Sequence, residues 1–318
     1  LIKKLGVKFK FNQRLGDNLS LDELKNEFDA IYLAIGAWKS IDLEIPGEDA
    51  TGVFSGTEIL KEMAVGKTPK VGRQVAVVGA GNVAIDTARS LLRLGKDVTI
   101  VYRREKEDMP ANAVEISESE EEKINYHFLA SPSEILSDKS GKVRALRIEK
   151  MMRGSIDSSG RKKPAATGVF EEIPCDTIVL AVGERDDSGC LVENSLELTR
   201  DGRIVIDPFT FQTSDPQIYA GGDAVSGPST AAEAMGMAKK AAAAMDRALT
   251  GENRFYLLSR PFNYRNVVPA NPRPALKNVP RRLPVKDRVN NFNEISFGFT
   301  GVQAPFHLIA SLHARKSE

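Results

Sequence analysis

Short apolar runs alternate with helix-like segments along most of the chain. Two of these runs, residues 29–36 and 176–183, end on a glycine. Apolar runs of this length bounded by glycine are typical of buried strands in a parallel sheet. The alternation over Val7–Phe11 also predicts a strand, following a helix end at residues 1–5 and its capping Gly6.

Three residue pairs have the spacing of capping boxes, in which a Ser or Thr and a Glu three positions later satisfy each other's backbone N–H groups. The pairs are Ser20 with Glu23, Ser55 with Glu58, and Thr230 with Glu233. They predict helices over 21–27, from 55 to about 64, and from 230 to 249, the last ending at Gly251.

The most regular stretch, residues 75–101, is a predicted βαβ unit. It consists of a buried strand over 75–78, a helix over 82–94 that stops at Gly95, and a second strand over 97–101. The pattern then becomes β-rich and hairpin-like from 143 to 182, and a last short strand is predicted at 218–220. Residues 252–296 lack a sustained period and predict an extended surface strap, followed by a weakly patterned end.

Composition narrows the classes of function. With 318 residues the chain can form two compact domains, and a net charge of +1 argues against nucleic acid and polybasic membrane surfaces as partners. Two cysteines and three histidines offer little material for a metal centre, so no metal site is expected. Without an apolar run near the length of a membrane span or a recognisable signal peptide, a cytoplasmic location is expected.

The strongest local motif is Gly79-Ala-Gly81-Asn82-Val83-Ala84, a G-x-G-x-x-A that follows a predicted strand and opens a predicted helix. Gly79 permits the tight turn, Gly81 lets a pyrophosphate approach the backbone, and Ala84 allows close packing of helix on strand. The helix N-terminus then offers unpaired N–H groups to the phosphates. A glycine turn without ligand is the alternative, and the complete βαβ context favours dinucleotide binding.

The residues after the second strand indicate which dinucleotide is bound. An NAD site usually has a carboxylate there, whereas this chain has Arg103 and Arg104. Two guanidinium groups favour the 2′-phosphate of NADP(H). The alternative is that both arginines are solvated charges at a strand end.

A second motif, Gly221-Gly222-Asp223, precedes the helix predicted to begin at Thr230 and Ala231. A carboxylate after such a turn can accept a hydrogen bond from a ribitol hydroxyl, and the helix N-terminus can face the electron-rich edge of a flavin. Gly-Asp turns are also frequent as purely structural features, so this motif gains weight only in combination.

In combination these motifs resemble those of the FAD/NAD(P) flavoproteins. The strands that end at Gly36 and Gly183 are similar to the paired glycine-terminated strands of that superfamily, and Ile45-Pro46-Gly47 matches its I-P-G. Residues 79–110, with Val101-Tyr-Arg-Arg104, resemble the NADPH domain of the glutamate synthase small (beta) subunit family. Residues 219–223 with 230–234 resemble the C-terminal FAD motif of that family.

The resemblance implies an α/β fold in which a Rossmann-like NADPH-binding domain is inserted in an FAD-binding domain. It implies that NADPH gives hydride to FAD and that electrons pass on to iron–sulfur clusters of a partner subunit or domain. Hydride transfer needs no protein acid or base, so no catalytic side chain is assigned. The alternative from a different class is a non-catalytic NADPH-binding or scaffold subunit of a redox complex.

The expected division is a partial FAD domain at 1–69, an NADPH domain at 70–183, the rest of the FAD domain at 184–250, and a strap and tail at 251–318. The first FAD motif of the family is not in the chain, so we expect weak or no FAD binding and self-association of this stretch alone. The acidic run 118–122 is expected to be a solvated helix face rather than a docking surface for a basic partner. Cys175 and Cys190 are expected to be buried packing residues.

Overall fold

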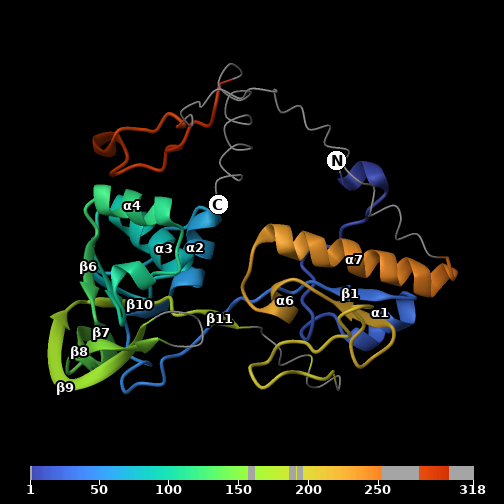
Figure 1. Ribbon diagram of the computed structural model, residues 1–318, viewed down its shortest axis with the longest axis horizontal. Helices are drawn as coiled ribbons and strands as arrows, with labels where there is room; N and C mark the ends of the chain where they lie inside the picture. Colours follow the sequence, from blue (N-terminus) through green and yellow to red (C-terminus); the bar gives the residue numbers. More distant parts are fainter. Residues whose placement is uncertain (1, 157–161, 186–190, 192–195, 253–278, 301–318) are drawn as a thin grey trace. The chain divides into compact units, whose positions relative to one another are not determined.

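A computed structural model describes residues 2–156, 162–185, 191, 196–252 and 279–300 (Figure 1). Clustering of contacts divides the chain into two units. Unit 1 consists of Leu1–Ile41 with Gly183–Arg260, and unit 2 of Asp42–Val182 with Pro261–Glu318. Each unit therefore combines segments that are far apart in sequence.

Unit 2 is built on a five-stranded sheet in the order β3-β10-β4-β5-β6, in which all neighbouring strands are parallel. Its strands are β3 (Val53–Ser55), β4 (Gln74–Val78), β5 (Asp97–Tyr102), β6 (Asn125–Phe128) and β10 (Thr177–Leu180). The predicted βαβ unit is confirmed, with helix α3 at Asn82–Arg93 between β4 and β5. The predicted apolar strand at 176–183 is the buried strand β10.

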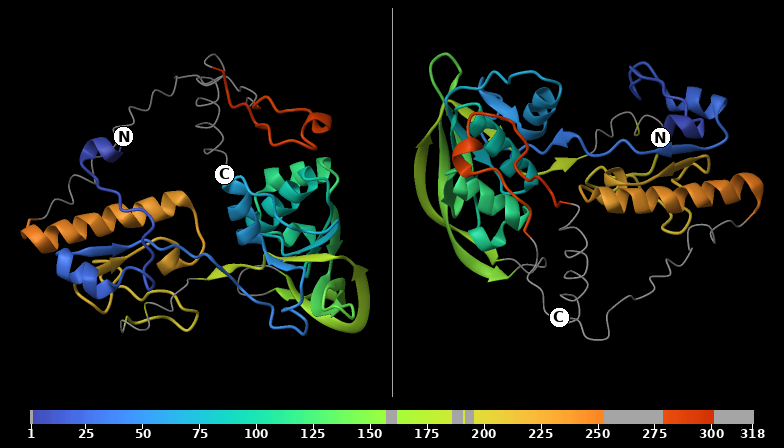
Figure 2. Two further views of the ribbon diagram at one scale, coloured as in Figure 1. Left: turned by 180° about the vertical axis from the view of Figure 1, so that it is seen from behind. Right: turned by 90° about the horizontal axis from the view of Figure 1, so that it is seen from above.

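The sheet of unit 2 is covered on both faces, as Figures 1 and 2 show. One face carries α3 together with α2 (Gly56–Ala64) and α4 (Ala113–Glu121). The other face carries a three-stranded antiparallel sheet of β7 (Ala130–Ser137), β8 (Val143–Ile156) and β9 (Lys162–Pro174). Strands β8 and β9 lie in the β-rich stretch predicted from 143 to 182, whereas β7 precedes it. Because successive side chains of a strand point to opposite faces, Val75 and Val77 pack under the helices, whereas Ala76 and Val78 pack against β8.

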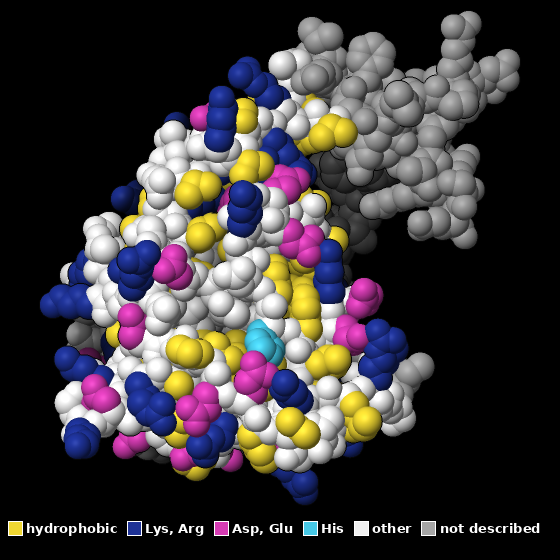
Figure 3. All heavy atoms as spheres, turned by 90° about the vertical axis from the view of Figure 1, so that its left-hand side faces the viewer, with side chains coloured by type: hydrophobic (Ala, Val, Ile, Leu, Met, Phe, Trp, Pro, Cys, Tyr) yellow, Lys and Arg dark blue, Asp and Glu magenta, His cyan; other side chains and the backbone are white. Residues whose placement is uncertain are grey.

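The three-stranded sheet carries several exposed ion pairs. Arg147 pairs with Glu134 and Glu172, and Lys150 pairs with Glu171 at 2.8 Å. On the face of the molecule drawn in Figure 3, Lys and Arg side chains are interspersed with Asp and Glu. This mixture agrees with the near-zero net charge of the chain.

The boundary between the units differs from the expected one. Residues 42–69 were assigned to an FAD domain, but they belong to unit 2 because β3 completes its sheet beside β10. Helix α2 also packs on α3, where the Thr87 hydroxyl donates to the Gly56 carbonyl oxygen at 3.4 Å. The chain passes between the units at 41/42 and at 182/183.

Unit 1 has a parallel pair of short strands, β1 (Ile31–Leu33) and β12 (Ile218–Ala220). Its other elements are η1 (Ile2–Leu5), α1 (Leu21–Glu27), β2 (Lys39–Ser40), β11 (Glu184–Arg185), α6 (Asp223–Ser226) and α7 (Ala231–Thr250). The capping boxes that open α1 and α7 are confirmed, and Gly251 ends α7 in the left-handed conformation. At α2, the Ser55 hydroxyl accepts from the Glu58 N–H at 3.4 Å.

The strand predicted at residues 7–11 does not form. Phe9 and Phe11 are 47% and 71% exposed, and within the described part of the chain no strand pairs with this segment. An alternating pattern specifies a strand only when a neighbouring strand supplies hydrogen bonds and a face to cover, which explains the failure.

The acidic run 118–122 is only partly the expected solvated face, because Glu120 and Glu121 are exposed but Glu118 and Glu122 are buried. Glu118 and Glu122 are 7% and 5% exposed and pair with Arg89, at 2.9 Å and 2.7 Å. Arg288, from the segment 279–300, pairs with Glu121 at 2.9 Å and is itself 5% exposed. The described end of the predicted strap contains the short 3₁₀ helix η4 (Val285–Asp287), and its Arg288 pairs it with α4.

The remaining strap residues 253–278 and the tail 301–318 lie outside the described residues. A short helical turn, η2 (Lys106–Asp108), follows β5. None of the described helices is long and apolar enough to cross a lipid bilayer.

Candidate dinucleotide-binding sites

The G-x-G-x-x-A motif forms the turn between β4 and α3. Gly79 has a φ of +129°, and a Cβ there would overlap the carbonyl oxygen of Ala181 on the neighbouring strand. Its N–H donates to the Val101 carbonyl oxygen at 3.0 Å, which fixes the turn between β10 and β5. Ala84 is fully buried where the helix packs on the sheet. These two positions need small residues for the fold itself.

The start of α3 is open toward solvent. Gly81 is the N-cap residue, it offers no side-chain cap, and the first turn contains no acidic residue. A Cβ built on Gly81 would meet no atom within 4 Å. The backbone N–H groups and the positive end of the helix dipole therefore face open space, as a phosphate site requires.

The turn also lies at a place in the sheet where doubly wound α/β proteins commonly bind ligands. From β4 the chain continues through β5 and β6 on one side, while β10 lies on the other. Such a reversal of strand order at the carboxyl ends of parallel strands is where doubly wound sheets bind dinucleotides. Asn82, at the first helical position, accepts a hydrogen bond from the Asn112 N–H at 3.0 Å and so ties the 109–112 loop to the helix start.

The two arginines after β5 have different surroundings. The Arg103 side chain is exposed, whereas Arg104 is only 8% exposed. An exposed guanidinium is available to an anionic ligand, so Arg103 is the more accessible of the two. The adjacent Tyr102 hydroxyl donates to the Asp108 carbonyl oxygen at 2.8 Å and orders the turn that follows.

The Gly-Gly-Asp turn of unit 1 is tightly packed. A Cβ on Gly221 would overlap the Tyr32 hydroxyl, and burial raises the pKa of this tyrosine. Gly222 has a φ of +70°, and a Cβ there would lie 3.5 Å from the Cβ of Ala234 in α7. The turn therefore places Asp223, the first residue of α6, beside the beginning of α7.

The N-terminus of α7 is capped by its own side chains. The Glu233 carboxylate accepts from the Thr230 N–H at 3.2 Å and from the Thr230 hydroxyl at 2.9 Å, and it also contacts the Ser229 hydroxyl. The hydrogen bonds from Ser229 and Thr230 lower the pKa of Glu233 below its ordinary value. Thr230 and Ala231 are exposed.

The two strand-terminal glycines belong to unit 1. Gly36 has a φ of +71° and adjoins the Trp38 side chain, while Gly183 has a φ of +141° and its carbonyl oxygen accepts from the Ile41 N–H at 3.1 Å. The candidate site residues thus fall into two groups. Gly79, Gly81, Asn82, Val83, Ala84, Arg103 and Arg104 lie in unit 2, whereas Gly36, Gly183, Gly222, Asp223, Thr230 and Ala231 lie in unit 1.

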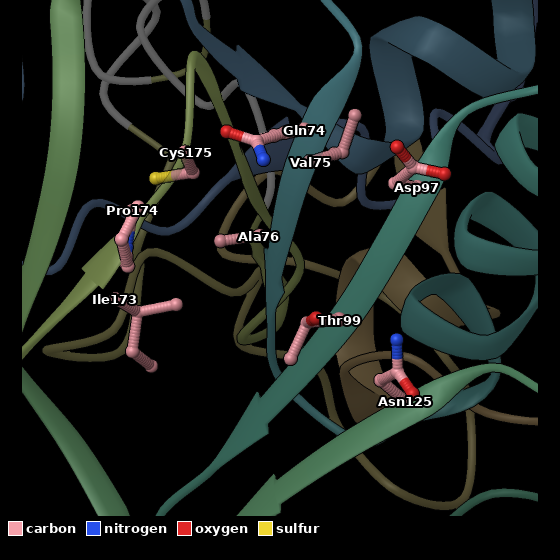
Figure 4. Close-up of a pocket in the computed structure, with 9 residues that line it drawn as sticks. All are labelled: Gln74, Val75, Ala76, Asp97, Thr99, Asn125, Ile173, Pro174 and Cys175. Carbon is pink, nitrogen blue, oxygen red and sulfur yellow. The ribbon is translucent and has the colours of Figure 1, made fainter.

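A cavity of about 210 Å³ lies at the amino ends of β4 and β5, at the other end of these strands from the glycine turn. Figure 4 shows its lining residues, which include Gln74 and Asp97 at the beginnings of β4 and β5 and Cys175 after β9. Burial raises the pKa of the Cys175 thiol to about 12, so this cysteine is a packing residue, as expected, and not a nucleophile. Cys190 lies outside the described residues.

Among the residues that the structure describes, no cluster of three or more His, Cys, Asp or Glu side chains could hold a metal ion.

Comparison with known proteins agrees with this architecture. Residues 2–238 match the family described as pyridine nucleotide-disulphide oxidoreductase, and the chain belongs to this family. It is 38% identical over 253 residues to the NADP(+)-dependent formate dehydrogenase subunit beta of Moorella thermoacetica, covering 78% of this chain and 36% of that protein. It is 34% identical over 255 residues to the glutamate synthase [NADPH] small chain of Escherichia coli, covering 75% and 54%.

The chain therefore spans roughly a third to a half of these relatives, and its resemblance to the glutamate synthase small-chain group is confirmed. Among solved structures, FprA of Mycobacterium tuberculosis, in complex with NADPH, has a TM-score of 0.62 at 23% identity. That match covers 76% of this chain and 69% of FprA. Together with the family match, this likeness confirms the predicted α/β fold.

Several residues of these sites have no signal in the sequence. The Tyr32 hydroxyl packs against Gly221, although the two residues are nearly two hundred positions apart. The Asn112 N–H, in the loop before α4, donates to Asn82 at the start of α3. Glu105 is paired with two cations of the β8–β9 hairpin. Each depends on contacts between distant segments, which periodicity and motif spacing do not report.

Proposed function

We propose that this protein binds NADPH at the β4–α3 turn of unit 2 and FAD in unit 1, as the nicotinamide- and flavin-binding part of an oxidoreductase that supplies electrons to iron–sulfur clusters of a partner. The observation that carries the proposal is the start of α3, where an uncapped helix N-terminus faces open space at the switch point of the sheet. Arg103, exposed at the end of the next strand, supports NADPH over NADH.

The residues present fit both dinucleotides. The free N–H groups of α3 would hold a pyrophosphate, and Arg103 would bind the 2′-phosphate. In unit 1, Asp223 offers a carboxylate for a ribitol hydroxyl, and the glycine turn before it packs against Tyr32 and α7. Bound together, the two cofactors would supply hydride transfer followed by single-electron release, for which the protein provides binding and orientation rather than an acid or base.

The relatives support a role within a larger assembly. The names of two of them contain "subunit beta" and "small chain", and both include NADP(+) or NADPH. An electron-accepting partner subunit or domain with iron–sulfur clusters is accordingly part of the proposal. The prediction that the present stretch holds FAD weakly or not at all remains to be tested.

A second candidate function is a non-catalytic NADPH-binding or scaffold subunit. It is favoured by one difference between the units: the α3 N-terminus is open, whereas the N-terminus of α7 is already filled by the Glu233 carboxylate. A protein that binds only NADPH would need the first site and not the second.

The test is to purify the full chain and measure its flavin content, its visible spectrum and its NADPH affinity. Loss of the oxidised flavin absorbance on anaerobic addition of NADPH supports the oxidoreductase. Tight NADPH binding with no reduction of FAD supplied in large excess supports the scaffold alternative. Absence of NADPH binding contradicts both.

A further inference from the structure

A carboxylate closely follows the arginines that are expected to select NADPH. Glu105 comes two residues after Arg103, near the position where an acidic side chain normally bonds the unphosphorylated ribose of NAD. Left free, it would repel a 2′-phosphate and could accept from a 2′-hydroxyl, which opposes the effect of Arg103.

Both oxygens of this carboxylate are engaged by the β8–β9 hairpin. Arg153 Nη2 lies 2.5 Å from Glu105 Oε1, and Lys162 Nζ lies 3.5 Å from Oε2. The Glu105 side chain is only 15% exposed, whereas Arg153 and Lys162 are 62% and 47% exposed. The carboxylate is thus turned inward under two cations that remain in contact with solvent.

The backbone holds the hairpin in this position. The Met151 N–H donates to the Leu129 carbonyl oxygen at 2.7 Å, and the Leu129 N–H donates to the Arg104 carbonyl oxygen at 3.1 Å. Through Leu129, these two hydrogen bonds connect β8 to the segment that contains Arg103 and Arg104. A Cβ on Gly154 would lie 2.5 Å from the Lys163 carbonyl oxygen, so a small residue is needed where the strands bring both cations together.

The hairpin also holds the next carboxylate. The Lys162 N–H donates to Asp108 Oδ1 at 3.3 Å. Two of the acidic side chains that follow Arg103 therefore have partners in the hairpin, while the Arg103 side chain itself is exposed. Besides Arg103, the exposed charged side chains of this segment are Lys106, which pairs with Glu120, and Glu107.

We propose that Arg153 and Lys162 are specificity-determining residues that favour a 2′-phosphorylated nucleotide by holding the Glu105 carboxylate away from the nucleotide edge of the sheet. They act through Glu105 and are positioning residues rather than ligands of the phosphate. This inference rests on the proposed NADPH site at the β4–α3 turn.

The test is a double-mutant cycle in the full chain, with equilibrium affinities for NADPH and NADH measured for each variant. Arg153→Ala is expected to lower the ratio of NADPH to NADH affinity about three- to fivefold, the size typical of one exposed charge interaction. Replacing Lys162 by Ala as well should lower it further. In a Glu105→Gln background, Arg153→Ala should leave the ratio unchanged, because no carboxylate remains to be held.

Arg147→Ala is the matched control, since Arg147 lies on the same strand but pairs with Glu134 and Glu172. An unchanged ratio in Arg153→Ala, including an equal loss for both nucleotides, overturns the inference. An undiminished drop in the Glu105→Gln background also overturns it, since Arg153 would then contact the phosphate itself. Unaltered nucleotide binding by Gly81→Val would instead show that the proposed site is wrong, whatever the ratios.

Discussion

Each unit has a glycine turn that follows a strand, and the longer helix near each turn begins differently. In unit 2, α3 begins at Gly81 with no side-chain cap and no acidic residue in its first turn. In unit 1, the glycine turn opens the short helix α6, which has no side-chain cap but has Asp223 in its first turn. The longer helix α7 begins further on, at Thr230, inside a complete capping box closed by Glu233. One helix presents its N–H groups to open space, and the other satisfies part of them internally.

This difference shows that a glycine turn before a helix does not by itself define a phosphate site. What matters is whether the first helical N–H groups remain available and whether space is left in front of them. By this criterion the proposed nucleotide site of unit 2 would lie within that unit, whereas the turn of unit 1 would contribute the Asp223 carboxylate. Four experiments test this contrast, from the largest expected effect to the smallest.

Replacing Gly81 with Val should have the largest effect. The added side chain enters space that is empty of protein atoms, so the fold should tolerate it, but it blocks the approach of a pyrophosphate. Loss of at least two charge-assisted hydrogen bonds raises the Kd for NADPH about 100-fold or more, about 2.7 kcal/mol. Calorimetric titration measures the Kd, and an unchanged Tm confirms that folding is preserved.

Gly79→Ala should damage the fold instead. Gly79 has a φ of +129° and a Cβ there overlaps the Ala181 carbonyl oxygen, so we expect a loss of about 2 kcal/mol in the free energy of unfolding. Gly81→Ala is the matched control and should be close to neutral in urea denaturation. Equal stabilities for the two variants would contradict the different roles given to the two glycines.

Arg103→Ala should weaken NADPH binding about tenfold, about 1.4 kcal/mol, and leave NADH binding unchanged, because it removes a charge-assisted bond to the 2′-phosphate. Arg104→Ala, at a position that is only 8% exposed, should change the preference less. Competition with adenine nucleotides that carry a 2′-phosphate measures how much each arginine contributes to binding that phosphate. A larger change of preference in Arg104→Ala than in Arg103→Ala would reverse the assignment.

Thr230→Ala should lower the stability of α7 by about 1 kcal/mol, the usual loss for a helix cap, as measured by hydrogen exchange along the helix. Gly236→Ala, in the same helix with open space around its Cβ, should shift exchange in the opposite direction. Hydrogen bonds lower the pKa of Glu233 below 4.5, so its stabilising contribution is present above pH 4.5. That contribution is lost as the pH falls through the lowered pKa, and α7 should then exchange faster.

Local sequence rules predicted the elements that are specified locally. The helix starts at Ser20 and Thr230, the βαβ unit around Gly79, and the strand at 218–220 all form as expected. The same rules failed at residues 7–11, where an alternating pattern has no partner strand in the described structure, and at Glu118 and Glu122 of the acidic run, which are buried.

By itself, the sequence determined the family and the positions of the two glycine turns, because turn, cap and strand preferences act over a few neighbouring residues. Only the tertiary structure decided that β3 and α2 join unit 2, that the Glu118–Glu122 run meets Arg89 and Arg288, and that Glu105 is paired with Arg153. These outcomes depend on which distant segments pack together. Burial and charge pairing between such segments are properties of the folded arrangement and not of any local stretch of sequence.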